Sequence, residues 1–189
     1  MIRIGVVGDI GSGKSHIAKL FEYPIFNADL EVAKIYNTNK KCFKSLKKEL
    51  PKYFSSLPIK KEDIIKAIAD SEKNLKKITK IVHPEIKKKL NIFLKNNKKE
   101  EAVILDIPLL LENKLNQKGD IIIFIQSKKK EITKRLKKRS NFNLDLLNKF
   151  KKIQFSPSHK KKNSHFIIKN NFTNKSAKTS IRKIIKRIL

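Results

Sequence analysis

The feature that most constrains this chain is the stretch of residues 8–15, which reads Gly-Asp-Ile-Gly-Ser-Gly-Lys-Ser and fits the pattern G-x-x-x-x-G-K-[ST]. A largely apolar run, residues 2–7, precedes it, and a segment with helical spacing, residues 14–21, follows it. Glycines let such a backbone pass close to phosphates, while successive N–H groups and the helix N-terminus attract anions. The order strand, glycine-rich loop, helix therefore predicts a phosphate-binding loop, and a glycine-rich turn without a ligand is the alternative.

The residue types in this loop predict a nucleotide with a metal ion. Lys14 would reach the β- and γ-phosphates of ATP, and the Ser15 hydroxyl would bind Mg²⁺. The nucleotide-binding residues predicted here are Gly8, Asp9, Ile10, Gly11, Ser12, Gly13, Lys14, Ser15 and His16.

Four further apolar runs predict strands, and they alternate with helical segments. They are residues 24–27, 102–106, 121–125 and 165–168. The run at 121–125 is apolar throughout, which is typical of a strand buried on both faces of a parallel sheet. We expect an α/β fold of the P-loop NTPase class, with three α/β/α layers, a parallel sheet, a helical acceptor-binding insert and a helical lid.

The predicted segments give one unit with three parts and no separating linker. Residues 1–36, 101–127 and 163–189 would form the nucleotide-binding core, residues 37–100 a helical acceptor subdomain, and residues 128–160 a lid. His83-Pro84 lies inside the helical part. Because proline is tolerated in the first turn of a helix, we expect His83 at a helix entry, where such a residue is more often structural than catalytic.

Two aspartates follow predicted strands. Asp29 comes after the strand 24–27, and Asp106 ends the strand 102–106. Ligands of open α/β sheets lie beyond the carboxyl ends of the strands. Asp29 could accept a proton from an attacking hydroxyl, or it could cap the following helix, and the spacing leaves both readings open. Asp106 is similar to the aspartate that helps to place Mg²⁺ in P-loop enzymes.

The formal charge of +29 allows three interpretations: nucleic-acid binding, an anionic small-molecule substrate, or a bias of composition toward lysine. The lysines are scattered over every predicted helix, and runs such as residues 160–162 are expected on solvated faces or loops. We favour compositional bias, with a contribution from binding an anionic small-molecule substrate. We expect no specific nucleic-acid partner. No apolar stretch has the length of a membrane span, and Cys42 is the only cysteine, so we expect a cytoplasmic protein with no membrane partner.

Six motifs in order resemble those of one family. They are the loop 8–15, Asn27-Ala28-Asp29, His83-Pro84, Pro108-Leu109-Leu110-Leu111-Glu112, the basic segment 134–139, and Gln154 followed by Lys160 and residues 168–171. With these motifs at these intervals, nearly the whole chain resembles the dephospho-coenzyme A kinases.

The resemblance implies transfer of the ATP γ-phosphoryl group to the ribose 3′-hydroxyl of dephospho-CoA, the last step of coenzyme A synthesis. We also expect the protein to be a monomer. Asp29 would be the base, Lys14 and the lid residue Arg139 would contact the ATP phosphates, and Asn170 would lie near the adenine. Ser15 and Asp106 would hold Mg²⁺. The residues that would face the acceptor are Asp29, Lys34, His83, Pro108, Leu110 and Glu112.

The chain also departs from the family pattern. Asn27 stands where an aspartate is usual, Lys34 where an arginine is usual, Asp9 where a glycine is common, and His165 and Phe172 replace an aspartate and a glycine. Two other functions remain open at this point. One is another small nucleoside or nucleotide kinase on the same fold, and the other is a basic nucleic-acid-binding ATPase.

Overall fold

The structure is a computed structural model that describes residues 1–138 and 144–189. The chain forms two compact units, one made of residues 1–27 with 97–189 and the other of residues 28–96. None of the described helices is long and apolar enough to cross a membrane.

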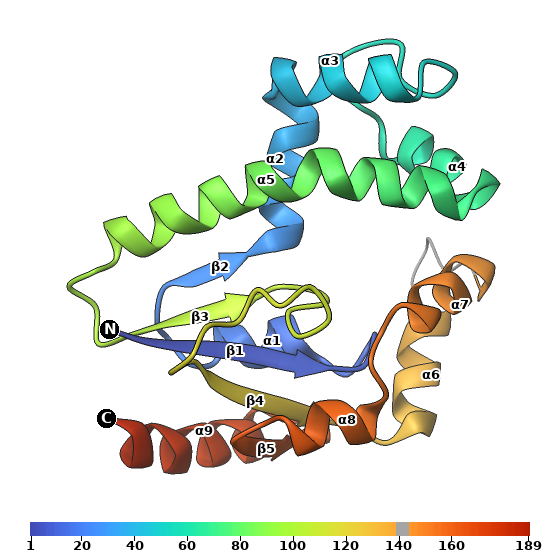
Figure 1. Ribbon diagram of the computed structural model, residues 1–189. Coiled ribbons are helices and arrows are strands. Elements are labelled where there is room, and N and C mark those ends of the chain that lie inside the picture. Colours follow the sequence, from blue (N-terminus) through green and yellow to red (C-terminus); the bar gives the residue numbers. More distant parts are fainter. Residues whose placement is uncertain (139–143) are drawn as a thin grey trace. The chain divides into compact units, whose positions relative to one another are not determined.

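The first unit is built on a five-stranded sheet in which every pair of neighbours is parallel (Figure 1). The strand order is β2-β3-β1-β4-β5. The strands are β1 (Ile2–Gly8), β2 (Ile25–Asn27), β3 (Ala102–Asp106), β4 (Ile121–Gln126) and β5 (Phe166–Lys169). This sheet confirms the predicted α/β fold with a parallel sheet.

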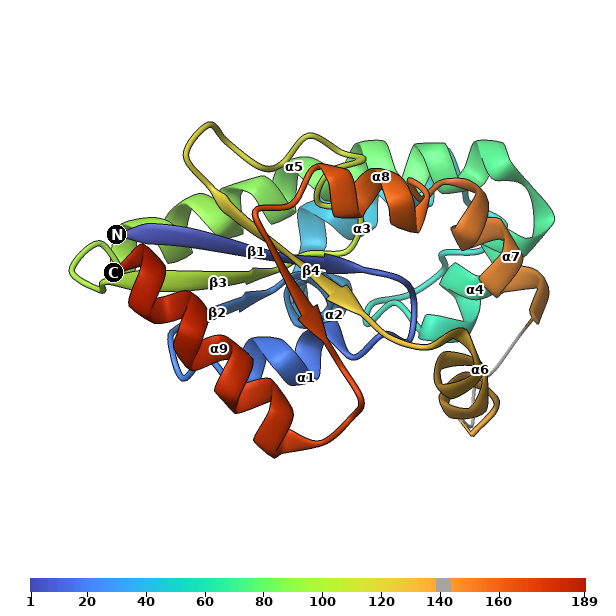
Figure 2. The same cartoon turned by 90° about the horizontal axis from the view of Figure 1, so that it is seen from below.

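The sheet is buried on both faces, as the apolar strands predict. On one face α1 (Lys14–Lys19) and α9 (Asn174–Ile188) pack on side chains such as Ile4 and Ile104, and Figure 2 shows both helices on the same side. The opposite face carries Val103 and Leu105, which are also fully buried. The strands therefore lie in the interior, and the loops at their carboxyl ends are the parts of the sheet that can bind a ligand.

The described residues between β4 and β5 contain three short helices. They are α6 (Lys129–Lys137), α7 (Leu144–Lys152) and α8 (Pro157–Lys162). The prediction that residues 160–162 are solvated is wrong for Lys160, because this lysine is buried. Its Nζ lies 3.1 Å from Glu112 Oε1 and donates to Gln154 Oε1 at 3.2 Å, so the charge is paired inside the protein. The neighbouring Lys161 and Lys162 are exposed.

The second unit is helical, as expected for this part of the chain. It contains α2 (Ala28–Thr38), α3 (Lys40–Glu49), α4 (Lys61–Asp70) and α5 (Glu72–Asn96). Asn39 caps α3, since its side-chain oxygen accepts a hydrogen bond from the N–H of Cys42 at 2.9 Å.

The expected helix entry at His83-Pro84 is wrong, because Pro84 lies inside α5. Proline lacks an N–H and usually ends or kinks a helix. Here the helix continues on both sides of it, and its buried residues recur at every fourth position, at Ile78, Val82, Ile86 and Leu90. The burial of this apolar stripe outweighs the loss of one backbone hydrogen bond.

Candidate active site

The phosphate-binding loop connects the end of β1 to the start of α1, in the predicted place. Gly11 and Gly13 have φ angles of 86° and 90°, in the left-handed region that favours glycine. A Cβ atom on Gly13 would lie 2.5 Å from the Nδ2 atom of Asn170. Any other residue at position 13 would therefore collide with the side chain of Asn170, which directly follows β5.

Two side chains hold the loop by the same carbonyl group. The Nδ2 atom of Asn170 donates to the Ser12 carbonyl oxygen at 2.8 Å, and the Ser127 hydroxyl donates to it at 2.9 Å. Asn170 directly follows β5, and Ser127 directly follows β4. The resemblance to the family placed Asn170 near the adenine, whereas no motif in the sequence pointed to Ser127.

The interior of the loop suits an anion. The Lys14 ammonium donates to the carbonyl oxygens of Gly8 at 3.1 Å and Asp9 at 2.9 Å, which keeps its charge at the loop. The Ser12 Oγ atom is buried and has no hydrogen-bond partner within the described residues. An unsatisfied buried hydroxyl is unfavourable, and a phosphate oxygen would accept its hydrogen bond.

The other two predicted residues of this segment are exposed. Ser15 lies in the first turn of α1. The Nε2 atom of His16 lies 2.7 Å from Asn174 Oδ1, at the start of α9. The structure thus joins His16 to the last helix of the same unit.

Asp106 lies beside Asn27 at the carboxyl edge of the sheet. These residues are partners in the register of β2 and β3, and the Asn27 amide donates to Asp106 Oδ2 at 2.7 Å. Asp106 is 4% exposed. A carboxylate with little contact to water is oriented here by an amide on the next strand.

The second unit carries three of the predicted residues. Asp29 lies in the first turn of α2 and is exposed, and Lys34 in the same helix pairs with Glu31 at 2.6 Å. A carboxylate in a first turn also interacts favourably with the helix dipole. His83 lies within α5, where partial burial disfavours the charged imidazolium and lowers its pKa.

The segment 108–112 contacts its own unit. Leu110 is 1% exposed, and a Cβ atom on Gly5 would lie 2.5 Å from its side chain. Glu112 pairs with Lys160, and it also accepts a hydrogen bond from the Phe155 N–H at 2.9 Å. Leu110 and Glu112 are therefore already packed or paired. Arg139 of the predicted lid lies outside the described residues.

A cavity of about 610 Å³ adjoins the phosphate-binding loop. Asp9 and Ile10 of the loop form one wall, and residues of α6, α7 and the start of α8 form the others. Apolar side chains such as Leu136 and Leu147 lie beside Lys129 and Lys151 in its lining. This mixture can receive an anionic ligand that also has an apolar part.

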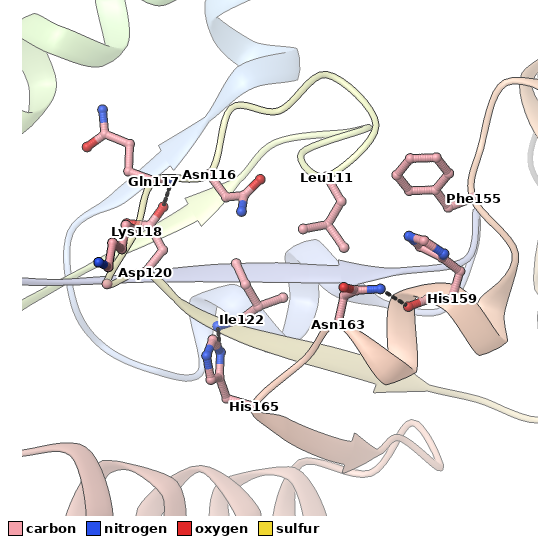
Figure 3. Close-up of a pocket in the computed structure, with 11 residues that line it drawn as sticks. Leu111, Asn116, Gln117, Lys118, Asp120, Ile122, Phe155, His159, Asn163 and His165 are labelled. Carbon is pink, nitrogen blue, oxygen red and sulfur yellow. Dashed lines mark hydrogen bonds between the residues drawn. The ribbon is translucent and has the colours of Figure 1, made fainter.

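A second cavity, of about 360 Å³, lies beside the beginning of β4 (Figure 3). Several of its polar groups bind each other. His165 Nδ1 accepts a hydrogen bond from the Ile122 N–H at 2.9 Å, and Asn163 Nδ2 donates to the His159 carbonyl at 2.9 Å, as the dashed lines in Figure 3 show. These contacts fix the connection into β5 and give the cavity a structural explanation.

The chain is similar in sequence to known proteins of one family. The model of the dephospho-CoA kinase family matches residues 2–176. A dephospho-CoA kinase of Wolbachia pipientis wMel is 31% identical over 170 residues, which are 87% of each chain. Another, from the Wolbachia of Brugia malayi, is 29% identical over 187 residues, covering 96% of this chain and 95% of the relative.

Solved structures agree on the fold. The chain is similar to TT1252 from Thermus thermophilus, with a TM-score of 0.79 and 23% identity over 100% of this chain and 98% of that one. It is also similar to dephospho-CoA kinase from Campylobacter jejuni, with a TM-score of 0.63 and 22% identity over 98% and 96%. A shikimate kinase from Bacteroides thetaiotaomicron has a TM-score of 0.51 at 12% identity. These neighbours support the predicted P-loop kinase fold, and the family model and curated relatives establish that this chain belongs to the dephospho-CoA kinase family.

Proposed function

We propose that this chain transfers the γ-phosphoryl group of ATP to the ribose 3′-hydroxyl of dephospho-CoA, giving CoA and ADP. The family match over residues 2–176 carries this proposal. The loop geometry supports it, because Lys14 and the buried Ser12 hydroxyl lie at the edge of the sheet where such folds bind ligands. Another nucleoside or nucleotide kinase remains the alternative, since the fold alone does not select the acceptor.

Asp29 is the proposed base. It stands two residues beyond the end of β2, in the first turn of α2. A carboxylate there would accept the proton of the 3′-hydroxyl as the oxygen attacks phosphorus, while ADP leaves with the former bridging oxygen. The phosphates would be held by Lys14, the loop amides and Arg139.

Ser15 and Asp106 are the proposed protein ligands of Mg²⁺. Mg²⁺ in kinases keeps several waters and takes one or two protein ligands beside the nucleotide phosphates. The described residues contain no group of three or more His, Cys, Asp or Glu side chains that could hold a metal, and this binding mode requires none. Two oxygen donors, with a carboxylate already oriented by Asn27, fit such an ion. When bound, the ion neutralises charge on the phosphate oxygens.

The remaining assignments concern the acceptor and follow the family pattern. We propose residues 37–100 as the acceptor subdomain and residues 128–160 as the lid. Lys34 and His83 would face dephospho-CoA from the helical unit, and residues 108–112 from the core. The Lys34 ammonium is exposed, so it can exchange its pairing with Glu31 for a substrate phosphate.

The partners and location follow from the same proposal. We propose that the enzyme is monomeric and cytoplasmic. We also propose that its positive charge does not serve to bind a specific nucleic acid. Weak binding to DNA or RNA that modest salt abolishes would agree with this view, because phosphate contacts are strongly salt-dependent. Tight, sequence-selective binding at physiological salt would favour the nucleic-acid-binding ATPase instead.

The experiment that tests the function is an ADP-release assay with Mg-ATP and four acceptors: dephospho-CoA, adenosine, nucleoside monophosphates and water. We expect turnover with dephospho-CoA alone and a product with the mass of CoA. Phosphorylated adenosine or nucleoside diphosphate as the main product would establish the alternative kinase. No acceptor-dependent ADP release by a folded protein would contradict both.

A further inference from the structure

The residue that precedes β5 pairs with β4 through both its backbone and its side chain. The His165 N–H donates to the Ile122 carbonyl oxygen at 2.8 Å, and the Ile122 N–H donates to His165 Nδ1 at 2.9 Å (Figure 3). In a parallel ladder, a backbone carbonyl oxygen of the neighbouring strand accepts such an N–H. β5 begins only at Phe166, so the imidazole of His165 supplies this acceptor in place of a backbone carbonyl.

The path of the chain before His165 explains why a side chain is used at this point. Asn163 is the C-cap residue of α8, and its N–H and its side-chain Nδ2 donate to the His159 carbonyl oxygen at 3.1 and 2.9 Å. This backbone is therefore held at the end of a helix. Ile122 is 3% exposed, and a buried N–H without an acceptor is unfavourable. The pairing of the Ile122 N–H thus depends on the imidazole.

The hydrogen bond from Ile122 fixes the protonation state of the His165 ring. A ring nitrogen that accepts a hydrogen bond carries no proton, so the neutral ring has its proton on Nε2. A second proton would go to Nδ1 and would place two N–H donors opposite each other across 2.9 Å. His165 is exposed, so the solvent can supply this proton.

The charged groups around the ring do not offset this loss. The other titratable residues among the described ones that line the same cavity are Lys118, Asp120 and His159. The Asp120 carboxylate is already paired with Arg3, whose Nε atom lies 3.0 Å from Asp120 Oδ1. Lys118 and His159 can only add positive charge. A protonated His165 therefore loses its backbone partner without gaining a carboxylate of its own.

We propose that His165 is a pH-sensitive switch for the pairing of β5 with β4. Histidine changes its charge between about pH 5 and pH 8. The paired state disfavours the extra proton, so the switch contributes stability at neutral pH and loses this contribution as the pH falls. The resemblance gives position 165 an aspartate in the family, and a carboxylate stays an acceptor over this range. The switch is therefore a property of this chain.

The opening caused by protonation should stay at the amino end of β5. Ile168, near the other end of the strand, is fully buried, and the Asn170 N–H donates to the Gln126 carbonyl oxygen at 2.8 Å. These contacts do not involve His165. The start of β5 should separate from β4 in mild acid while the support of the phosphate-binding loop by Asn170 remains.

The experiment measures hydrogen exchange of backbone amides in the full chain by NMR. Protection factors are compared at pH 8 and pH 5, which removes the intrinsic pH dependence of exchange. We expect the protection factor of the Ile122 N–H to fall by about 10-fold at pH 5, as for the loss of one hydrogen bond. The protection factor of the Asn170 N–H should stay within about 2-fold.

Four variants assign the change to the ring of His165. His165→Asn and His165→Asp keep an acceptor that gains no proton between pH 8 and pH 5, so Ile122 protection should change by less than about 2-fold. His165→Leu has no acceptor and should show low Ile122 protection at both pH values. His159→Gln is the matched control, because it removes the other histidine of the cavity and should keep the full change.

The outcomes decide on the switch separately from the proposed function, since no nucleotide or acceptor is used. Ile122 protection that does not depend on pH in the wild type would overturn it, and so would a change that persists in His165→Asn. The ¹⁵N spectrum of the wild-type ring gives a further test that needs no variant. We expect the proton on Nε2 at pH 8, and a neutral ring with its proton on Nδ1 would contradict the proposal.

Discussion

Asn27 and Asp106, at the ends of adjacent strands, are joined by a hydrogen bond of 2.7 Å from the amide of one to the carboxylate of the other. The resemblance gives position 27 an aspartate in the family, whereas this chain has a neutral amide there that donates to the Asp106 carboxylate. The proposed metal ligand is thereby oriented without a second negative charge beside it.

We predict that Asn27→Asp destabilises the protein increasingly as the pH rises. Two carboxylates at this distance repel each other, so the folded variant holds a proton that the unfolded chain releases. Because the folded state then binds more protons than the unfolded state, the variant loses stability as the pH rises. Urea unfolding should show a deficit of about 1–3 kcal/mol at pH 8 that shrinks at pH 5. The control is Asn91→Asp on the exposed surface of α5. Equal stability of Asn27→Asp and wild type at pH 8 would contradict the pairing.

The buried pair Glu112–Lys160 gives a second prediction. The two side chains are 8% and 4% exposed, so Lys160→Met would leave an uncompensated carboxylate and cost about 3–5 kcal/mol in urea unfolding. The double variant Glu112→Leu with Lys160→Met should recover much of this loss, because it removes both charges. If the double variant is no more stable than Lys160→Met, the stability lost in Lys160→Met does not come from the unpaired carboxylate.

The same pair tests whether Glu112 binds the acceptor. Glu112→Gln keeps the shape of the side chain and its acceptor for the Phe155 N–H. If Glu112 contacts dephospho-CoA as well, KM for this acceptor should rise at unchanged KM for ATP. If KM for both substrates stays as in wild type while stability falls, Glu112 only connects its loop to α8.

The two readings of Asp29 predict different results for Asp29→Asn. A base would lose about 10²–10⁴-fold in kcat with ATP affinity retained. A residue that serves only the start of the helix, as the capping alternative proposed, would interact with the helix dipole from its place in the first turn of α2, and its loss would cost about 0.3–1 kcal/mol of stability at full kcat. Glu31→Gln, in the same first turn of α2, is the matched control and should keep kcat. We expect the first result, and full turnover by Asp29→Asn would remove the base assignment.

His83 predicts a dependence of stability on pH. Burial lowers its pKa, so the folded state binds fewer protons than the unfolded chain around the ordinary value of 6.5. Stability is therefore fully present above that pH and falls as the pH decreases through it. His83→Gln should lose less stability between pH 8 and pH 5 than wild type does in urea unfolding. His16→Gln, an exposed histidine, is the control, and equal losses in wild type and His83→Gln would refute the prediction.

The edge of the sheet could be predicted because parallel strands place their carboxyl ends together. This rule predicted the phosphate-binding loop and the aspartates that follow the predicted strands at one edge of the sheet, whereas Asn170 followed only from the resemblance to the family. The hydrogen bond from Asn27 could not be predicted, since it depends on the register of β2 against β3. Ser127 was missed because a serine after a strand has no pattern of its own.

The errors have a common physical cause, which is that local patterns omit tertiary partners. A run of three lysines does not reveal which one is buried, and the partner of Lys160 is the distant Glu112. Proline in His83-Pro84 indicated a helix entry, but packing of the apolar face of α5 overrides this local preference. Residues 139–143, which include Arg139, lie outside the described residues, so the lid assignment stays a prediction.

The two hydrogen bonds that Asn170 and Ser127 donate to the Ser12 carbonyl oxygen have a consequence during synthesis of the chain. Because synthesis proceeds from the N-terminal side, the glycine-rich loop leaves the ribosome long before Asn170, one of its two fixing side chains, which lies 158 residues after Ser12. The nucleotide site can therefore take its final form only after Asn170 has been made. Until then, an incomplete chain has the sequence of a phosphate-binding loop without the support that shapes it.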